Sequence, residues 1–217
     1  MFTTRFQAWV RRNAQRLAAA LRRLPITPNQ VTVAGMLATF VAATLAGFGD
    51  LLAAGLVLAF AGTFDILDGA LARATKRMYP YGAFLDSTTD RYAEGAIYIG
   101  IAAYFLNHPQ REGNVLVLAC VCALAGSFLV SYVRARAQSL GFTCDSGIFA
   151  RPERVVATVI GLLFGGWVLQ VVVIGLAILT NVTVIQRVRE VWLQGRAQRR
   201  AAERVAEAPA AGETTPG

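Results

Sequence analysis

Four aspartates placed beside apolar segments are the residues of this chain best suited to chemistry. Asp65 and Asp68 follow one uncharged apolar run, and Asp86 and Asp90 precede another. A carboxylate at depth in a bilayer costs roughly 2.5–3.5 kcal/mol on insertion scales, so it usually serves a function. On a helix, Asp65 and Asp68 share one face, and so do Asp86 and Asp90. Two such helices facing each other would bring the four side chains together.

A carboxylate cluster of this kind is suited to binding hard divalent cations. Four acids so close cannot all stay ionised without a counter-charge. Oxygen-only ligands suit Mg²⁺, Ca²⁺ or Mn²⁺, and protein-bound Mg²⁺ commonly takes substrate phosphate oxygens as well. No histidine or cysteine lies in the segment 65–90, which disfavours zinc. Gly69 allows close approach of a ligand, and Arg73 offers a planar fork for phosphate.

The order of these residues resembles the signature of the CDP-alcohol phosphotransferases, a family of integral membrane enzymes that make phospholipids. Its fixed positions are matched by Asp65, Asp68, Gly69, Ala72, Arg73, Gly82, Asp86 and Asp90. The resemblance implies two divalent ions, Mg²⁺ with Mn²⁺ as a substitute, held by the four aspartates. It also implies a CDP-linked lipid donor, CDP-diacylglycerol, and Asp90 as the general base.

Four residues are expected to bind the CDP-lipid: Asn29, Gly69, Arg73 and Tyr79. Asn29 belongs to a Pro-Asn pair that similar enzymes carry near the donor's cytidine, although an asparagine there can equally cap the first spanning helix. Tyr79 would contact the donor mainly through its backbone, because the loop 76–80 differs from the Thr/Ser-Arg-Phe type seen in similar enzymes.

The segment after the fourth apolar run, together with Arg187, is expected to bind an acceptor phosphate. The planar fork of arginine suits phosphate, so Ser131, Arg134, Arg151, Arg154 and Arg187 are the candidate ligands. Arg134 would lie at the cytoplasmic end of the fourth span, Arg154 at the start of the fifth, and Arg187 at the end of the sixth. The alternative interpretation is that these arginines only anchor the topology.

Two strings in this region, SYVRARA at 131–137 and RPER at 151–154, are similar to those of the actinobacterial phosphatidylinositol phosphate synthases. This resemblance implies transfer of the phosphatidyl group from CDP-diacylglycerol to inositol phosphate, with release of CMP. Glycerol 3-phosphate, inositol and serine remain open as acceptors of the same chemistry. A divalent-cation transporter would explain the carboxylates but not the glycines, alanine and arginine in register with them.

Glu94 is a further acid on the same helical face, one turn beyond Asp90. It could support the metal site or the acceptor site. It could equally pair with an arginine, and the sequence leaves these alternatives open.

Composition predicts an all-α integral membrane protein. The 217 residues are 55% hydrophobic and only 16% charged, with a formal net charge of +8, which argues for a polytopic membrane protein and against a nucleic-acid binder. We expect an amphipathic interfacial helix at 1–24, six transmembrane helices across 25–195, and a basic, then disordered, tail at 196–217. The uncharged run 155–186 is too long for one span, so a hairpin is expected at Gly165-Gly166.

Charge placement predicts the orientation of these spans. With six spans, only Arg111 among the basic residues falls in a loop on the side opposite both termini. The positive-inside rule then places both termini and the active site in the cytoplasm of a multi-pass cell-membrane protein. Its partners would be membrane lipids, the CDP-lipid and a small phosphorylated alcohol. A homodimer is expected because similar enzymes are homodimers.

Overall fold

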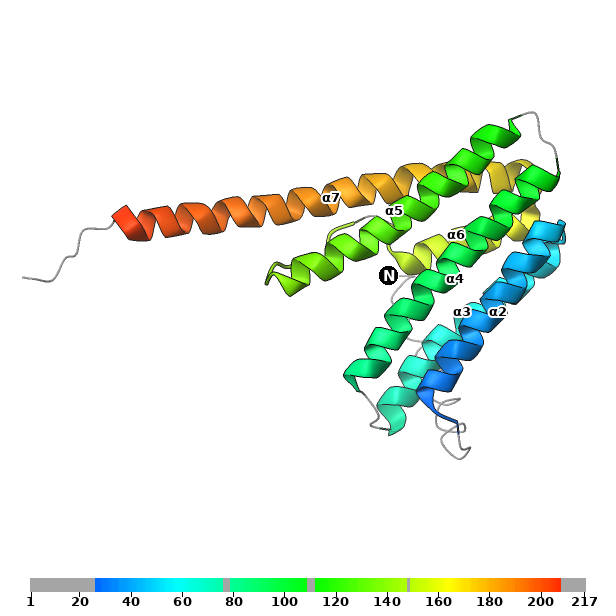
Figure 1. Ribbon diagram of the computed structural model, residues 1–217, viewed down its shortest axis with the longest axis horizontal. Coiled ribbons are helices and arrows are strands. Elements are labelled where there is room, and N and C mark those ends of the chain that lie inside the picture. Colours follow the sequence, from blue (N-terminus) through cyan, green and yellow to red (C-terminus); the bar gives the residue numbers. More distant parts are fainter. Residues whose placement is uncertain (1–25, 76–78, 109–111, 148, 208–217) are drawn as a thin grey trace, which may run out of the picture.

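The computed structural model describes residues 26–75, 79–108, 112–147 and 149–207, and all regular secondary structure in these ranges is helical. Six helices follow one another along the chain (Figure 1): α2 (Pro28–Phe48), α3 (Leu51–Thr75), α4 (Pro80–Asn107), α5 (Gly113–Ser139), α6 (Arg151–Phe164) and α7 (Gly166–Glu207). The interfacial helix expected at 1–24 lies outside the described residues, as does the tail beyond 207. The segment 196–207 continues α7 without a break.

Local signals in the sequence set the helix ends. At the start of α2, Thr27 and Gln30 exchange side-chain-to-backbone hydrogen bonds in a capping box, and Pro28 occupies the first turn. The helix stops at Gly49, whose φ of 93° is left-handed. The turn predicted at Gly165-Gly166 is present: α6 ends at Phe164 and α7 begins at Gly166.

Four of the described helices are long and apolar enough to cross a membrane: α2, α3, α5 and the 166–204 part of α7. Helix α4 has 28 residues but carries several charged side chains. Helix α6 has 14 residues, about 21 Å at 1.5 Å per residue, which is shorter than the ~30 Å hydrocarbon core. The described residues therefore form six helices, but length and composition do not by themselves make all six of them spans.

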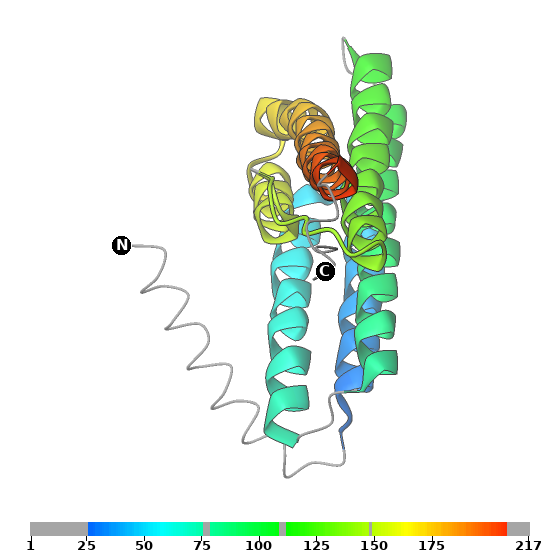
Figure 2. The same ribbon diagram turned by 90° about the vertical axis from the view of Figure 1, so that its left-hand side faces the viewer.

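The helices are arranged as a closed ring. Each one packs mainly against two others, in the order α2, α3, α6, α7, α5, α4 and back to α2. Figure 2 shows the ring flattened into two layers, with α2, α4 and α5 in one layer and α3, α6 and α7 in the other. Helices α3 and α4 follow each other in sequence, yet they face each other across the ring interior rather than packing as neighbours.

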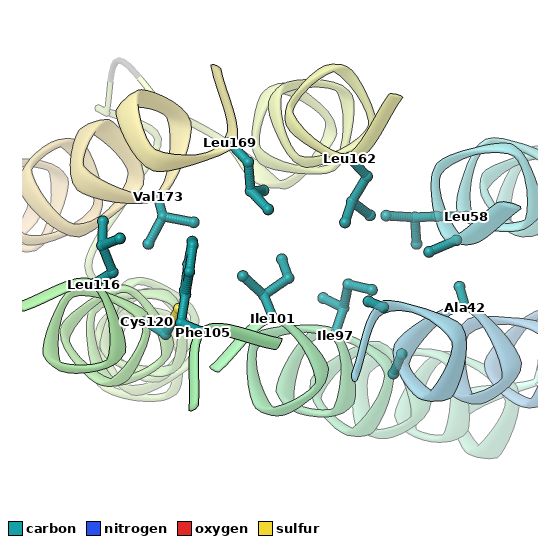
Figure 3. Close-up of a cluster of buried hydrophobic side chains, with 13 residues drawn as sticks. Ala42, Leu58, Ile97, Ile101, Phe105, Leu116, Cys120, Leu162, Leu169 and Val173 are labelled. Carbon is teal, nitrogen blue, oxygen red and sulfur yellow. The ribbon is translucent and has the colours of Figure 1, made fainter. Parts of the chain in front are cut away.

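Apolar side chains from both layers fill one end of the ring interior. Ile97, Ile101 and Phe105 of α4 meet Leu162 of α6 and Leu169 of α7 between the layers (Figure 3). The four aspartates lie at the other end, because they sit in the C-terminal half of α3 and the N-terminal half of α4. The ring therefore has an apolar end and a polar end.

Replacing Gly100 with alanine should loosen the packing of α2 on α4. A methyl group at Gly100 would collide with the backbone carbonyl oxygen of Ala43, and overpacking of this kind costs about 1–3 kcal/mol. Gly175→Ala is the matched control, because nothing lies within 4 Å of a methyl group there. Thermal unfolding in detergent micelles should show a lower melting temperature for Gly100→Ala alone. Equal melting temperatures for the two variants would contradict this close approach.

Candidate active site

Helices α3 and α4 carry the signature aspartates on the faces that look into the ring. Asp68 is 6% exposed, and it accepts a hydrogen bond of 2.6 Å from the Thr32 hydroxyl of α2 and another from the Gly69 N–H. Its carboxylate also lies within repulsive range of Asp86 and Asp65. The acids of both helices therefore share one electrostatic environment.

Arg151, the first residue of α6, places its guanidinium between two of these acids. Its Nη1 is 2.9 Å from Oδ2 of Asp65, and its Nη2 is 2.7 Å from Oδ1 of Asp90. One side chain thus joins α3, α4 and α6. It also supplies part of the counter-charge that closely spaced carboxylates require.

Glu94 forms an ion pair with Arg154, one turn further along both helices. The distances are 2.6 Å from Nε to Oε1 and 3.2 Å from Nη2 to Oε2, while Nη1 donates to the carbonyl oxygen of Phe149 at 3.2 Å. Arg154 is 2% exposed and Glu94 is 8% exposed. Of the alternatives that the sequence left open for Glu94, the arginine partner is the one found.

Two residues near the aspartates, Thr32 and Arg91, were not predicted from the sequence. Thr32 bonds Asp68 from a neighbouring helix, and no spacing rule within one helix could reveal that contact. Arg91 lies 3.6 Å from Asp90 and 3.9 Å from Glu94. Its position three residues before Glu94 is the ion-pair spacing of a helix, which was a usable signal.

The four donor-site candidates line one pocket of about 460 Å³. Asn29 belongs to α2, Gly69 and Arg73 belong to α3, and Tyr79 directly precedes α4. The same pocket is also lined by Asp68, Asp86, Ala72 and Gly82. Residues separated in sequence by the whole α2–α3 hairpin thus surround one cavity.

The acceptor-site candidates do not all meet at one point. Arg151 and Arg154 line a second, small cavity of about 40 Å³ together with Asp65, Asp90 and Glu94. Arg187 is buried and donates to the carbonyl oxygens of Ser146 and Val130 at 3.0 and 2.6 Å.

The other two candidates lie on the α5 side. Half-exposed Arg134 is 3.1 Å from Asp145, and the Ser131 hydroxyl donates to the carbonyl of Ser127. Arg187 still lies within electrostatic range of Arg134 and Arg154. Of the five candidates, only Arg151 and Arg154 therefore line a cavity together with the aspartates.

The chemistry of the acidic cluster fits divalent cations. Within the described ranges, no three Asp, Glu, His or Cys side chains are close enough to hold one ion in the arrangement seen, and Arg151 engages oxygens of Asp65 and Asp90. The donors are nevertheless hard carboxylate oxygens from two facing helices, the type that Mg²⁺ and Mn²⁺ prefer. The Arg151 guanidinium lies between Asp65 and Asp90, so positive charge is stabilised between these two carboxylates.

Residues 25–189 match the family model of the CDP-alcohol phosphatidyltransferases. The chain belongs to this family. Phosphatidylinositol phosphate synthase of Mycobacteroides abscessus is 38% identical over 181 residues, 81% of each chain. Archaetidylinositol phosphate synthase of Pyrococcus horikoshii is 39% identical over 182 residues, 83% of this chain and 92% of the relative. The resemblance drawn from the motif is therefore confirmed, and the protein is a CDP-alcohol phosphatidyltransferase.

Solved structures share the arrangement of helices. The phosphatidylinositol phosphate synthase of Mycobacterium tuberculosis with CDP-DAG bound superimposes with a TM-score of 0.76 at 34% identity, over 83% of this chain and 94% of that one. The structure of the same enzyme in complex with manganese and citrate gives a TM-score of 0.74, over 82% and 88% of the two chains. The ring of helices is thus the fold of this enzyme.

Removing the charge of Glu94 should destabilise the protein strongly. Glu94→Gln leaves Arg154 buried without a counter-charge, and breaking such a pair costs about 3–5 kcal/mol. Glu203→Gln breaks the exposed Arg199–Glu203 pair of α7 and should cost less than about 1 kcal/mol. Denaturant unfolding in micelles measures both.

A double variant, Glu94→Met with Arg154→Met, separates the buried charge from the loss of packing. It should recover much of the stability, because a neutral pair leaves no charge unpaired. A Glu94→Gln variant as stable as Glu203→Gln would contradict the buried ion pair.

Proposed function

We propose that this phosphatidyltransferase uses CDP-diacylglycerol as its donor and inositol phosphate as its acceptor, yielding phosphatidylinositol phosphate and CMP. The observation that carries the proposal is the shared pocket in which Asn29, Gly69 and Arg73 lie beside Asp68 and Asp86. The bound CDP-DAG in the tuberculosis enzyme supports the donor. The acceptor is supported by the relatives, which are named phosphatidylinositol phosphate synthase and archaetidylinositol phosphate synthase.

In this proposal the pocket holds the donor and the aspartates hold two divalent ions, Mg²⁺ or Mn²⁺. Asn29 and Tyr79 would lie near the cytidine, and Gly69 and Arg73 near the pyrophosphate. The ligands of the ions would be Asp65, Asp68, Asp86 and Asp90. When bound, the ions would neutralise the pyrophosphate and the charge that develops on the departing CMP. The manganese in the tuberculosis enzyme supports a divalent ion.

Asp90 is the proposed general base. It would take the proton of the acceptor hydroxyl, whose oxygen forms a bond to the lipid-side phosphorus while the bond from that phosphorus to CMP breaks. Asp90 lies 3.6 Å from Arg91 and 2.7 Å from Arg151, and these two contacts orient its carboxylate. Arg73 would help to position the pyrophosphate, since positioning and charge neutralisation are the main tools of this kind of transfer.

The acceptor phosphate is proposed to bind among Ser131, Arg134, Arg151, Arg154 and Arg187. Arg154 already donates from Nε, Nη1 and Nη2 to Glu94 and Phe149, and Arg187 donates from Nε and Nη1 to backbone carbonyls. Both would therefore act mainly as fixed positive charges. Arg151 and half-exposed Arg134 would make the direct contacts. A charge-assisted hydrogen bond contributes about 1.5–3 kcal/mol, enough to favour a phosphorylated alcohol over a free one.

We also propose that the protein is a multi-pass cell-membrane protein with cytoplasmic termini, in which all six helices contact lipid. The acids of α4 line the two cavities described above, whereas Tyr92, Ile99 and Leu106 are exposed at seven-residue spacing. On α6, Val156, Ile160 and Phe164 are also exposed, at four-residue spacing. Such stripes suit contact with lipid tails or with the second subunit of a homodimer.

The proposed reaction is tested with purified protein, CDP-diacylglycerol, Mg²⁺ and four acceptors: inositol phosphate, glycerol 3-phosphate, inositol and serine. We expect CMP release and a phosphatidylinositol phosphate product by mass spectrometry, with loss of activity in EDTA and recovery on adding Mg²⁺ or Mn²⁺. A better rate with inositol or serine would refute the phosphate-binding region. Undiminished activity in excess chelator would refute the metal ions.

Two aspartate variants should separate the base from the metal ligands. Asp90→Asn keeps the size of the side chain but removes the proton acceptor, so turnover should fall by ~10²-fold or more while CDP-diacylglycerol binding largely survives. Asp68→Asn should weaken donor binding as well. Asp50→Asn, at the opposite end of α3, is the control for general effects of losing a carboxylate. Normal turnover by Asp90→Asn would assign the base to another residue.

A further inference from the structure

Two arginines of α6, one turn apart, reach two acids of α4, one turn apart, but the two contacts are built differently. Arg154 is 2% exposed and directs Nε, Nη1 and Nη2 to partners. The Arg151 side chain is 26% exposed, and its Nε is buried without a hydrogen-bond partner. The Arg154 contact is therefore saturated, whereas that of Arg151 is not.

The partners of Arg151 are acids of the proposed metal site. It binds Oδ2 of Asp65 and Oδ1 of Asp90, and these are oxygens that a divalent ion on the same two residues would need. A guanidinium and a divalent ion cannot occupy the same position between two carboxylates, since both are positive and both need the same lone pairs. Binding of one must displace the other.

We propose that Arg151 is a displaceable internal cation: a divalent ion releases it from Asp65 and Asp90, and the freed guanidinium then binds the acceptor's phosphate. This inference rests on the proposed function. The Arg154–Glu94 pair holds the first turn of α6 in place, so only the Arg151 side chain has to move. The adjoining cavity of about 40 Å³, lined by Arg151 and Asp90, can hold water around the released group.

The exchange couples two binding events. A divalent ion competes with Arg151 for the acids, and the acceptor phosphate competes with the acids for Arg151. Each ligand therefore favours the other, and by linkage the two enhancements must be equal. The site would bind acceptor phosphate well only when the ions are already in place.

The first test is the affinity of the purified protein for Mn²⁺, followed by the loss of the free-ion signal in electron paramagnetic resonance. Arg151→Gln removes the competing cation, so Mn²⁺ should bind about tenfold more tightly, a difference of about 1.4 kcal/mol. Arg189→Gln, at an exposed position of α7, makes the same change in net charge and should leave the affinity unchanged. An Arg151→Gln affinity equal to or weaker than that of the wild type would overturn the proposal.

The second test is the coupling itself. In the wild type, saturating Mn²⁺ should strengthen inositol phosphate binding, and inositol phosphate should strengthen Mn²⁺ binding by the same factor. Both effects should largely vanish in Arg151→Gln. In Arg151→Lys the Mn²⁺ affinity should lie between the two, because one ammonium cannot bridge both carboxylates as the guanidinium fork does. Coupling that persists in Arg151→Gln would overturn the proposal.

Folding of the variant is checked by melting temperature. Without metal, Arg151→Gln should melt below the wild type, since its acids lose a counter-charge, and Mn²⁺ should raise its melting temperature by more than it raises that of the wild type. An equal Mn²⁺-induced shift in both proteins counts against the displacement. A wild type that binds no Mn²⁺ would overturn the metal part of the proposed function as well. A wild type that binds Mn²⁺ with no gain in Arg151→Gln would overturn the displacement alone.

Discussion

Carboxylates packed together in an apolar helical ring must be given positive partners, and much of this structure follows from that constraint. Asp65, Asp90 and Glu94 obtain theirs from α6, whose first turn supplies Arg151 and Arg154. Isolated carboxylates in such surroundings would neutralise by taking up protons. The arginines favour the charged form of the acids that they contact, and the charged form is the one that can bind metal ions and accept a proton.

The ring order of the helices makes this pairing geometrically accessible. Helix α2 packs between α3 and α4, so the acidic faces of α3 and α4 lie on opposite sides of the ring interior. Helix α6 packs beside α3 on the side away from α2 and supplies its arginines there. The apolar layer behind them, around Ile97 and Leu162, fills the other end of the interior. The two cavities that the aspartates line lie toward the polar end of the ring.

The sequence predicted what depends on spacing within a helix and missed much of what depends on ring closure. The aspartate motif identified the family, and Gly165-Gly166 marked a turn that is present. The partner of Glu94 stayed open, since Arg154 lies 60 residues away and their meeting depends on how α6 docks. Thr32 was missed for the same reason. Six spans were predicted from the uncharged runs and from the placement of basic residues. In the structure α6 is short and α4 carries charges, because both helices supply charged side chains to the ring interior.

The long sequence separation of these ion pairs has a consequence for biosynthesis. Glu94 precedes Arg154 by 60 residues, and a ribosome adds ~5–20 residues per second, so Glu94 waits for roughly 3–12 s before Arg154 has been made. During that interval the acidic hairpin has no arginine from α6 to pair with, and its insertion is opposed by each carboxylate that enters the bilayer. The acids can reach the paired arrangement of the finished structure only after α6 has been made and has packed into the ring.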